Sequence, residues 1–351
     1  MRRMSYANAI NDAMHQAMAD DPAVICYGLG VADPKAVFST VAGLQERFGA
    51  QRVFEMPTSE NAMTGVAVGA ALGGLKPVMV HQRLDFFLLA MDQLVNSAAK
   101  WHYTYGPDNP VPITIRLIIG RGWGQGPTHS QNLQAWFAHI PGLKVVAPTT
   151  PEDARGMLLA AIHDPNPVVF LEHRWLHNGE GEVPDGDVRV PIGVAKTLRS
   201  GDDLTIVSQS FLTAEALRAA DYLQQIGVRP DLIDLRSVKP IDWPQLFASV
   251  ERTGRLLVLD PAFATGSVAG EIVARVAMER FACLRAAPAR LAMPDVPEPT
   301  SFGLTRGFYP GAGDIAAAAL RLLGRADAEA RQALPEPVPH DVPGPWFKGP
   351  F

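Results

Sequence analysis

The sequence predicts an α/β protein made of two parallel-sheet domains, each flanked by helices. Three observations support this fold class. The chain has 351 residues, which is too long for one ordinary core and fits two α/β domains. Short apolar runs typical of buried strands alternate with helical patterns in both halves of the chain. Between the halves, from about Asn178 to Arg199, the periodicity lapses into a polar, turn-rich stretch that we interpret as an interdomain linker.

The first half starts with a helical pattern and then alternates strands and helices. We expect strands over 24–27, 77–80, 113–119, 143–146 and 168–171, and helices over 7–18, 61–72, 86–100 and 151–163. The residues from Asn61 to Leu72 are small and apolar, which suits a helix packed tightly against a sheet.

The second half repeats the alternation. We expect strands over 204–208, 231–234 and 256–260, and helices over 212–227, 266–275 and 315–323. The predicted boundaries are therefore residues 1–190 for the first domain, 191–200 for the linker and 201–330 for the second domain. Residues 331–351 form a proline-rich tail that cannot build a core alone, so we expect Trp346 and Phe347 to dock on this chain or a neighbour.

Composition and charge narrow the class of protein. A hydrophobic fraction of 47% and a charged fraction of 19% are typical of a folded enzyme. The net charge of −5, with no run of lysine or arginine, argues against nucleic-acid binding. No secretory signal follows the first basic residues, and no window reaches the ~18 apolar residues of a membrane span. We therefore expect a soluble, cytoplasmic protein in which Cys26 is a buried free thiol.

The sequence does not match the common motifs for binding dinucleotides or zinc. The turn Gly28-Leu29-Gly30 follows a strand, but the third glycine of a dinucleotide fingerprint would fall at Asp33. The loop from Gly120 to Gly126 has glycine at every second residue, which indicates a loop that approaches an active site closely. His173 and His177 follow a strand pattern in which four residues span ~13 Å, too far for one zinc ion.

The informative segment surrounds Glu60. Pro57 fixes a turn, and Thr58 or Ser59 can cap the helix that follows. Glu60 then lies in the first helical turn, where an ordinary surface acid is favoured by the helix dipole. However, the helix is almost wholly small and apolar, so its start is expected at a buried interface. Burial raises the pKa of a carboxyl group and makes it a proton carrier near neutral pH.

Several further segments, in the same order and spacing, resemble the β subunit of 2-oxo acid dehydrogenase decarboxylase components, a branch of the transketolase superfamily. Besides the run around Glu60, these segments are Leu75-Lys76-Pro77-Val78, Asp85-Phe86, Ala90-Met91-Asp92-Gln93-Leu94-Val95-Asn96-Ser97-Ala98-Ala99-Lys100, Thr128-His129-Ser130-Gln131, Pro141-Gly142-Leu143-Lys144-Val145-Val146 and Ile233-Asp234-Leu235-Arg236. The resemblance covers about Met4 to Leu323. It implies a transketolase-like pyrimidine-binding domain followed by a transketolase C-terminal domain.

The resemblance also implies roles for individual residues. Glu60 matches the glutamate that hydrogen-bonds the aminopyrimidine of thiamine diphosphate and activates the cofactor. Phe86 matches the aromatic residue packed on the pyrimidine face, and Gln82 matches a position lining the same pocket. His129 matches the histidine at the mouth of the active site, which suits proton transfer or binding of the acyl intermediate.

A potassium site and a partner chain are implied as well. Positions that hold the ion mainly through backbone carbonyls in the family correspond to Ile113, Ala161, Ile162, Asp164 and Asn166. The superfamily binds magnesium and the diphosphate with Gly-Asp-Gly followed by Asn, whereas this chain has only Asp185-Gly186-Asp187, which we interpret as a turn. An α subunit is therefore expected to supply the magnesium and diphosphate site in an α2β2 heterotetramer, and a lipoyl acyltransferase is a further candidate partner.

Some positions depart from the family pattern, and they leave open which acceptor receives the group that the cofactor carries. Gly28-Leu29-Gly30 replaces the usual Gly-Glu-Asp, and Pro127-Thr128 replaces Ala-Gln before His-Ser. His81, Arg83 and Arg121-Gly122-Trp123 add cationic and aromatic character; the arginines either hold a phosphate or carboxylate or pair with acids at a subunit interface. The leading hypothesis is acyl transfer to a lipoyl group. The alternatives are a split transketolase or carboligase with an aldehyde or sugar acceptor, and a non-catalytic structural subunit.

Overall fold

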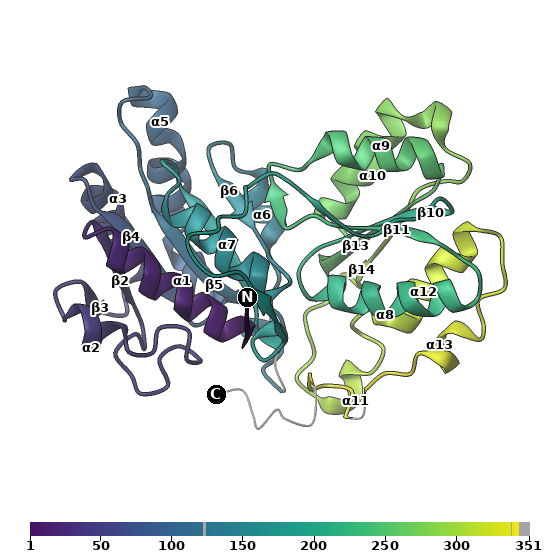
Figure 1. Ribbon diagram of the computed structural model, residues 1–351, viewed down its shortest axis with the longest axis horizontal. Helices are drawn as coiled ribbons and strands as arrows, with labels where there is room; N and C mark the ends of the chain where they lie inside the picture. The colour runs from purple at the N-terminus through teal and green to yellow at the C-terminus, as the bar shows by residue number, and fades with distance from the viewer. Residues whose placement is uncertain (122–123, 338, 344–351) are drawn as a thin grey trace. The chain divides into compact units, whose positions relative to one another are not determined.

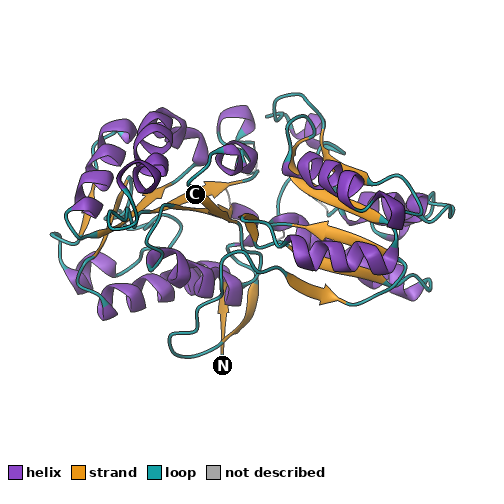
Figure 2. Ribbon diagram, turned by 90° about the horizontal axis from the view of Figure 1, so that it is seen from above, coloured by secondary structure: helices purple, strands orange, loops and turns teal. Residues whose placement is uncertain are grey.

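The computed structural model describes residues 1–121, 124–337 and 339–343. The chain forms two compact units (Figure 1). Of the described residues, the first unit contains 1–121 and 128–192, and the second contains 124–127, 193–337 and 339–343. Figure 2 shows strands between layers of helices in each unit, so the prediction of two helix-flanked α/β domains is confirmed.

The sheet of the first unit is parallel, with the strand order β6-β7-β5-β4-β2-β3. The strands are β2 (Val24–Gly28), β3 (Val53–Glu55), β4 (Lys76–His81), β5 (Thr114–Ile119), β6 (Lys144–Val146) and β7 (Val168–His173). Strands β2, β5 and β7 are buried along their whole length, as expected for a parallel sheet covered on both faces. Burial raises the pKa of the Cys26 thiol in β2 to about 12, so this cysteine is an uncharged, buried free thiol.

Two helices of the first unit begin at residues whose side chains cap them. In α1 (Tyr6–Asp20) the Ser5 hydroxyl accepts a hydrogen bond from the Asn8 amide, and in α7 (Pro151–Ile162) the Thr150 hydroxyl accepts one from the Asp153 amide. These two helices pack against each other. The remaining helical elements here are α2 (Leu44–Phe48), α3 (Glu60–Leu72), α6 (Gln134–His139) and the 3-10 turn η4 (Arg174–Leu176).

The single helix expected over 86–100 is wrong in detail. The segment divides into α4 (Leu84–Phe87), the 3-10 turn η1 (Leu88–Ala90), the π-helix η2 (Gln93–Ala98) and α5 (Ala99–Tyr105). Side chains in this segment bond to one another: Asn96 Nδ2 donates to Asp92 Oδ1 at 2.7 Å, and the Ser97 hydroxyl donates to Gln93 Oε1 at 3.3 Å. π-turns of this kind are common at functional sites.

The second unit contains a sheet of order β14-β13-β10-β11-β9, in which only β9 is antiparallel. Its strands are β9 (Lys196–Arg199), β10 (Leu204–Ser208), β11 (Pro230–Asp234), β13 (Leu256–Phe263) and β14 (Ala289–Met293). Its main helices are α8 (Phe211–Gln225), α9 (Trp243–Thr253), α10 (Val268–Glu279) and α12 (Ala312–Leu322). The short elements are β12 (Ser237–Lys239), α11 (Phe302–Thr305), α13 (Ala330–Ala333) and the 3-10 turn η5 (Phe281–Cys283). The 3-10 turn η3 (Gly126–Thr128) has its first two residues in the second unit and Thr128 in the first.

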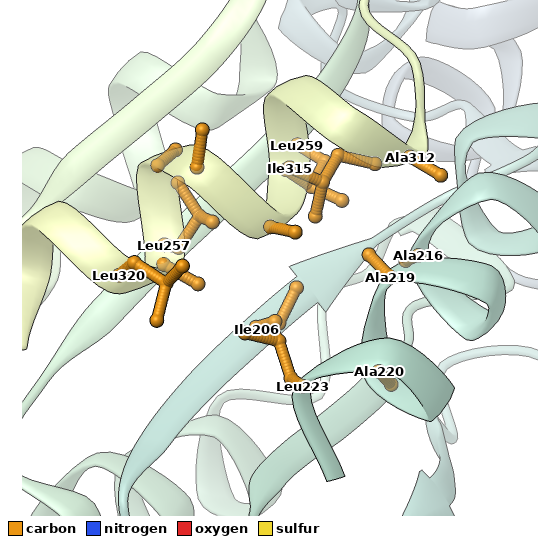
Figure 3. Packing of buried hydrophobic residues seen from close by; sticks show 14 of the residues in the cluster. Ile206, Ala216, Ala219, Ala220, Leu223, Leu257, Leu259, Ala312, Ile315 and Leu320 are labelled. Carbon is orange, nitrogen blue, oxygen red and sulfur yellow. The ribbon is translucent and has the colours of Figure 1, made fainter. Parts of the chain in front are cut away.

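Alanine-rich helix faces build the core of the second unit. Ala216, Ala219 and Ala220 of α8 face Ile206 of β10 and the residues around Ile315 of α12 (Figure 3). Small side chains let the two helices approach the sheet closely, and burial contributes roughly 25 cal/mol per Å² of apolar surface.

The stretch expected as an irregular linker contains regular structure. β8 (Glu180–Val183) pairs with β1 (Arg2–Ser5) in an antiparallel ribbon, and β9 forms the edge of the second sheet. Both are polar edge strands, so they carry no apolar run that would reveal them in the sequence. Asp185 and Asp187 lie in bends and form ion pairs with Arg2 and Arg189.

Trp346 and Phe347 of the tail lie outside the described residues, as do Gly122 and Trp123. Among the helices that the structure describes, none is long and apolar enough to span a membrane.

Candidate active site

The predicted site residues follow the carboxyl ends of neighbouring parallel strands. β2 lies between β3 and β4 and is parallel to both. Gly28 ends β2, Gln82 follows β4, and Glu60 comes after β3 at the start of α3. Because parallel strands end at the same edge of a sheet, this edge is where an α/β fold of this kind places its ligands.

Glu60 is the first residue of α3 and is 4% exposed. Its backbone carbonyl accepts a hydrogen bond from the Thr64 hydroxyl at 2.8 Å, but no hydrogen bond to its carboxylate is found in the part of the chain that the structure describes. The preceding Ser59 is the N-cap residue, yet its side chain makes no capping hydrogen bond. The capping that we expected from Thr58 or Ser59 is therefore absent from this helix start, and a buried carboxylate remains available to a ligand.

The loop that follows β2 passes close to Gln82, just after the end of β4. Gly30 has a φ of +78°, and a Cβ atom at this position would lie 2.5 Å from Nε2 of Gln82. Only glycine therefore fits there with Gln82 in place. The Glu55 carboxylate accepts hydrogen bonds from the amides of Gly30 at 2.9 Å and Ala32 at 2.5 Å. Glu55 thus supplies an acidic group to the loop that lacks the family's Gly-Glu-Asp.

Glu55 was missed by our sequence analysis. The signal was its position at the end of β3, a strand of three residues that is too short to stand out by periodicity.

The structure brings Phe86 and His129 together. Their ring centroids are 5.2 Å apart with an interplanar angle of 88°, an edge-to-face contact. Thr128 Oγ1 and His129 Nδ1 are hydrogen-bonded at 3.1 Å, so the unusual Thr128 orients the imidazole. Gln131 Nε2 donates to Asp85 Oδ1 at 2.6 Å and ties the histidine segment to α4. Sequence reasoning had not paired these two side chains.

The five positions matched to a potassium site cluster around one end of the sheet. The Val168 amide at the start of β7 donates to the Ile113 carbonyl at 3.0 Å, and the Asp164 amide donates to the Ala161 carbonyl at 3.2 Å. The Asn166 amide donates to Asp164 Oδ1 at 2.9 Å, and Lys144 forms an ion pair with the same carboxylate. These positions are close together, and the ion itself remains a prediction.

Two of the residues that add basic and aromatic character have clear packing partners. The guanidinium of Arg121 stacks on the Trp175 ring at 3.6 Å from its centroid. His81 is 2% exposed and packs edge-on against Phe87 at 4.9 Å. Burial lowers the pKa of His81 to about 4, so its imidazole is neutral at pH 7.

His177 lies beyond the end of β7 and after the turn η4, so the strand spacing assumed between His173 and His177 is wrong.

Two family models match the chain in succession. The model of the transketolase pyrimidine-binding domain matches residues 2–178, and that of the transketolase C-terminal domain matches residues 193–315. The solved structure of a split-gene transketolase, described as an inactive β4 tetramer, superposes with a TM-score of 0.75 over 92% of this chain and 98% of that chain. At 22% identity this likeness shows the fold alone.

Relatives of known function narrow the family. The chain is 41% identical over 330 residues to the pyruvate dehydrogenase E1 component subunit beta-2 of rice mitochondria, covering 93% of this chain and 88% of the relative. It is 39% identical to the β subunit of the acetoin:2,6-dichlorophenolindophenol oxidoreductase of Cupriavidus necator, covering 92% and 98%. It is also 39% identical to the 2-oxoisovalerate dehydrogenase β subunit of Bacillus subtilis, covering 85% and 91%.

The paired domains and the strand-edge site define a transketolase-type protein. Within that class, the chain belongs to the family of β subunits of thiamine-diphosphate-dependent 2-oxo acid dehydrogenase E1 components. The resemblance deduced from the motifs is thereby confirmed.

Proposed function

We propose that this chain activates thiamine diphosphate in a heteromeric 2-oxo acid dehydrogenase, with Glu60 as the residue that exchanges a proton with the cofactor's aminopyrimidine. The observation that carries the proposal is the buried Glu60 carboxylate, to which no described side chain or amide donates a hydrogen bond. A buried acid without an internal partner suits a ligand that supplies one.

Neighbouring residues fit the same ligand. Gln82 lines the strand edge against Gly30, and Phe86 offers an aromatic surface whose position is fixed by the contact with His129. When bound, thiamine diphosphate would supply a nucleophilic carbon for chemistry on the 2-oxo group of the substrate. Glu60 would hold a proton at the aminopyrimidine nitrogen, Phe86 would pack on the ring, and His129 would donate or accept a proton at the substrate side.

The decisive experiment replaces Glu60 with glutamine in the complex assembled with an α subunit. General acid–base catalysis contributes about 10²–10⁴-fold, so Glu60→Gln should lower turnover of pyruvate or 2-oxoisovalerate by that factor. Activity is measured by reduction of 2,6-dichlorophenolindophenol. Glu46→Gln, which changes an exposed acid in the first turn of α2, is the matched control and should leave turnover unchanged. Undiminished turnover in Glu60→Gln, with assembly intact, would overturn the assignment.

We further propose that an α subunit supplies the magnesium and diphosphate site and forms an α2β2 heterotetramer with this chain. The support is the absence of a Gly-Asp-Gly motif from the sequence. Asp185 and Asp187 are committed to Arg2 and Arg189, as expected for a surface turn. Potassium is proposed at Ile113, Ala161, Ile162, Asp164 and Asn166, which lie around the turn between α7 and β7 and its neighbour β5.

The acceptor of the acyl group distinguishes the two enzymatic functions. A dehydrogenase transfers it to a lipoyl group, and a split transketolase or carboligase transfers a two-carbon unit to an aldehyde. The relatives near 40% identity favour the dehydrogenase, since the split transketolase is similar in fold alone. Dependence of product formation on a lipoyl acyltransferase tests this choice, and formation of a ketol from an added aldehyde would favour the alternative.

A further inference from the structure

The loop after β2 leaves the sheet at a fixed point. Gly28 is the last residue of β2, and a Cβ atom there would lie 2.1 Å from the Val80 carbonyl oxygen of β4. The Gly28 carbonyl accepts a hydrogen bond at 3.2 Å from the amide of Met56, the residue after β3. No side chain fits at Gly28 between these strands, so the start of the loop is set by the sheet itself.

Glu55 holds the next part of this loop with both oxygens of its carboxylate. Oε2 accepts a hydrogen bond from the Gly30 amide at 2.9 Å, and Oε1 accepts one from the Ala32 amide at 2.5 Å. Hydrogen bonds to an ionised acceptor are stronger than those between neutral groups. The two bonds therefore fix the path of the backbone from Gly30 to Ala32 relative to the end of β3.

The backbone that Glu55 holds is the surface on which Gln82 lies. Gly30 has a φ of +78°, and a Cβ atom added there would be 2.5 Å from Gln82 Nε2, so the Gln82 amide occupies the space that a side chain would fill. Gln82 is exposed, and within the described parts of the chain its side-chain amide makes no hydrogen bond. Gly30 therefore restrains the Gln82 side chain while leaving its donors and acceptor available to a ligand.

Such a restraint affects affinity. Glutamine has a long, flexible side chain, and ordering a side chain of this kind when a ligand binds lowers affinity by about 2- to 10-fold. A side chain that already lies against fixed backbone avoids part of this loss. The backbone beneath Gln82 is fixed because the Glu55 carboxylate holds it.

We infer that Glu55 is a positioning residue for the cofactor. By binding the Gly30 and Ala32 amides, its carboxylate keeps the Gly30 backbone against Gln82 and so places the Gln82 amide for the aminopyrimidine of thiamine diphosphate. The inference rests on the proposed function, because it takes Gln82 to contact the cofactor. Glu55 acts through Gln82 and does not touch the cofactor itself.

The test measures the affinity of the assembled complex for thiamine diphosphate by isothermal calorimetry, with magnesium in excess. Glu55→Gln keeps the size of the side chain but turns an NH₂ group towards one of the two amides, so affinity should fall by about 2- to 10-fold. Glu55 is exposed, so this variant removes no buried surface. Glu46→Gln, which changes another exposed acid of the same unit, is the matched control and should bind as the wild type does.

A double-mutant cycle shows whether Glu55 acts through Gln82. Gln82→Ala should weaken binding at least as much as Glu55→Gln does, and Glu55→Gln should weaken it no further in the Gln82→Ala background. Gly30→Ala reaches the same contact from the other side, since its Cβ atom displaces Gln82 Nε2. It should weaken binding, and by less in the Gln82→Ala background, which keeps the test decisive if the Glu55→Gln complex does not assemble.

The outcomes separate this inference from the proposed function. Wild-type affinity in Glu55→Gln, or in Gln82→Ala, would overturn the positioning role and leave the proposed function standing. Losses that simply add in the double variants would do the same, because Glu55 and Gln82 would then act independently. A wild-type complex that binds no thiamine diphosphate would overturn the proposed function, and the positioning role with it.

Discussion

Two buried carboxylates, one in each unit, differ in how their hydrogen-bonding capacity is satisfied. Asp260 lies within β13 and is 0% exposed; its two oxygens accept hydrogen bonds from the amides of Ala262 and Ala269, both at 3.0 Å. Glu60 is 4% exposed at the start of α3, and no hydrogen bond to its carboxylate is found among the described residues.

The difference separates an acid with a structural role from the acid that we propose acts on the cofactor. Asp260 fixes the connection between β13 and α10, since it bonds to an amide in the first turn of that helix. The Glu60 carboxylate fixes no such connection among the described residues, which fits the role that we propose for it. Both carboxylates are buried, so burial does not distinguish Asp260 from Glu60. Their hydrogen-bond partners do.

The largest expected effect on stability comes from Asp260→Asn. One amide loses its acceptor and faces an NH₂ group instead, so we expect a loss of about 3 kcal/mol in the free energy of unfolding. Glu60→Gln should change it by less than about 1 kcal/mol, because no internal hydrogen bond is lost. Urea-induced unfolding of both variants checks this, with the exposed Asp221→Asn as control. An equal loss in the two buried variants would remove the distinction between them.

The next effect concerns pH and the histidines of the first unit. The pKa of His81 is lowered by burial to about 4, below its usual 6.5. Because the unfolded chain binds a proton that the folded chain rejects, the stabilisation is complete above pH 6.5 and is lost as the pH falls towards 4. From pH 6.5 to pH 5 the loss is about 2 kcal/mol.

His81→Phe should abolish the part of the acid-induced loss of stability that comes from His81, and it keeps an aromatic contact with Phe87. Urea midpoints at pH 7 and pH 5 measure it, and His102→Phe, at an exposed position in α5, is the control. If the free energy of unfolding of His81→Phe still falls between pH 7 and pH 5 as it does in the wild type, other groups cause the acid sensitivity. Some pH dependence should remain in any case, because burial also lowers the pKa of His173 to about 3.

The sequence predicted much of the sheet framework because its buried strands are continuous apolar runs. Strands β2, β5 and β7 and the helices α1, α3 and α7 lie where the periodicity placed them, within a few residues. β9 and β8 were missed because edge strands are polar and short. The division of the 86–100 helix was missed because a π-turn changes the hydrogen bonding without changing the apolar pattern.

The arrangement of the candidate site residues could not be predicted from the sequence, and their roles remain predictions. Glu60, Gln82, Phe86 and His129 were identified from motifs, but nothing in their spacing shows that Phe86 and His129 touch or that Glu55 holds the Gly30 amide. These contacts depend on loops whose paths are set by tertiary structure. The left-handed turn from Ala36 to Ser39 was equally hidden, since its residues have no preference for that conformation.

A smaller effect is expected where the active-site loop is tied to α4. Gln131→Ala removes the hydrogen bond to Asp85 and loosens the placement of His129 against Phe86. We expect kcat of the assembled enzyme to fall by about 3- to 10-fold, or ~1 kcal/mol, with the chemistry otherwise intact. Gln45→Ala, which removes a hydrogen bond to the Val53 carbonyl far along the chain from His129, is the control. Unaltered kcat in Gln131→Ala would show that Thr128 and Phe86 position the histidine without it.

The smallest effect tests the strained turn from Ala36 to Ser39. Ser39 is exposed with a φ of 68°, so Ser39→Gly relieves a left-handed serine without removing buried surface. Relief of roughly 1 kcal/mol is partly offset by the greater freedom of glycine in the unfolded chain, leaving a gain of about 0.5 kcal/mol. Ser301→Gly, at an exposed position with a φ of −69°, has no strain to relieve and should instead lose about 0.5 kcal/mol. Opposite signs in thermal unfolding support a turn held against its own conformational preference, and losses in both variants would contradict it.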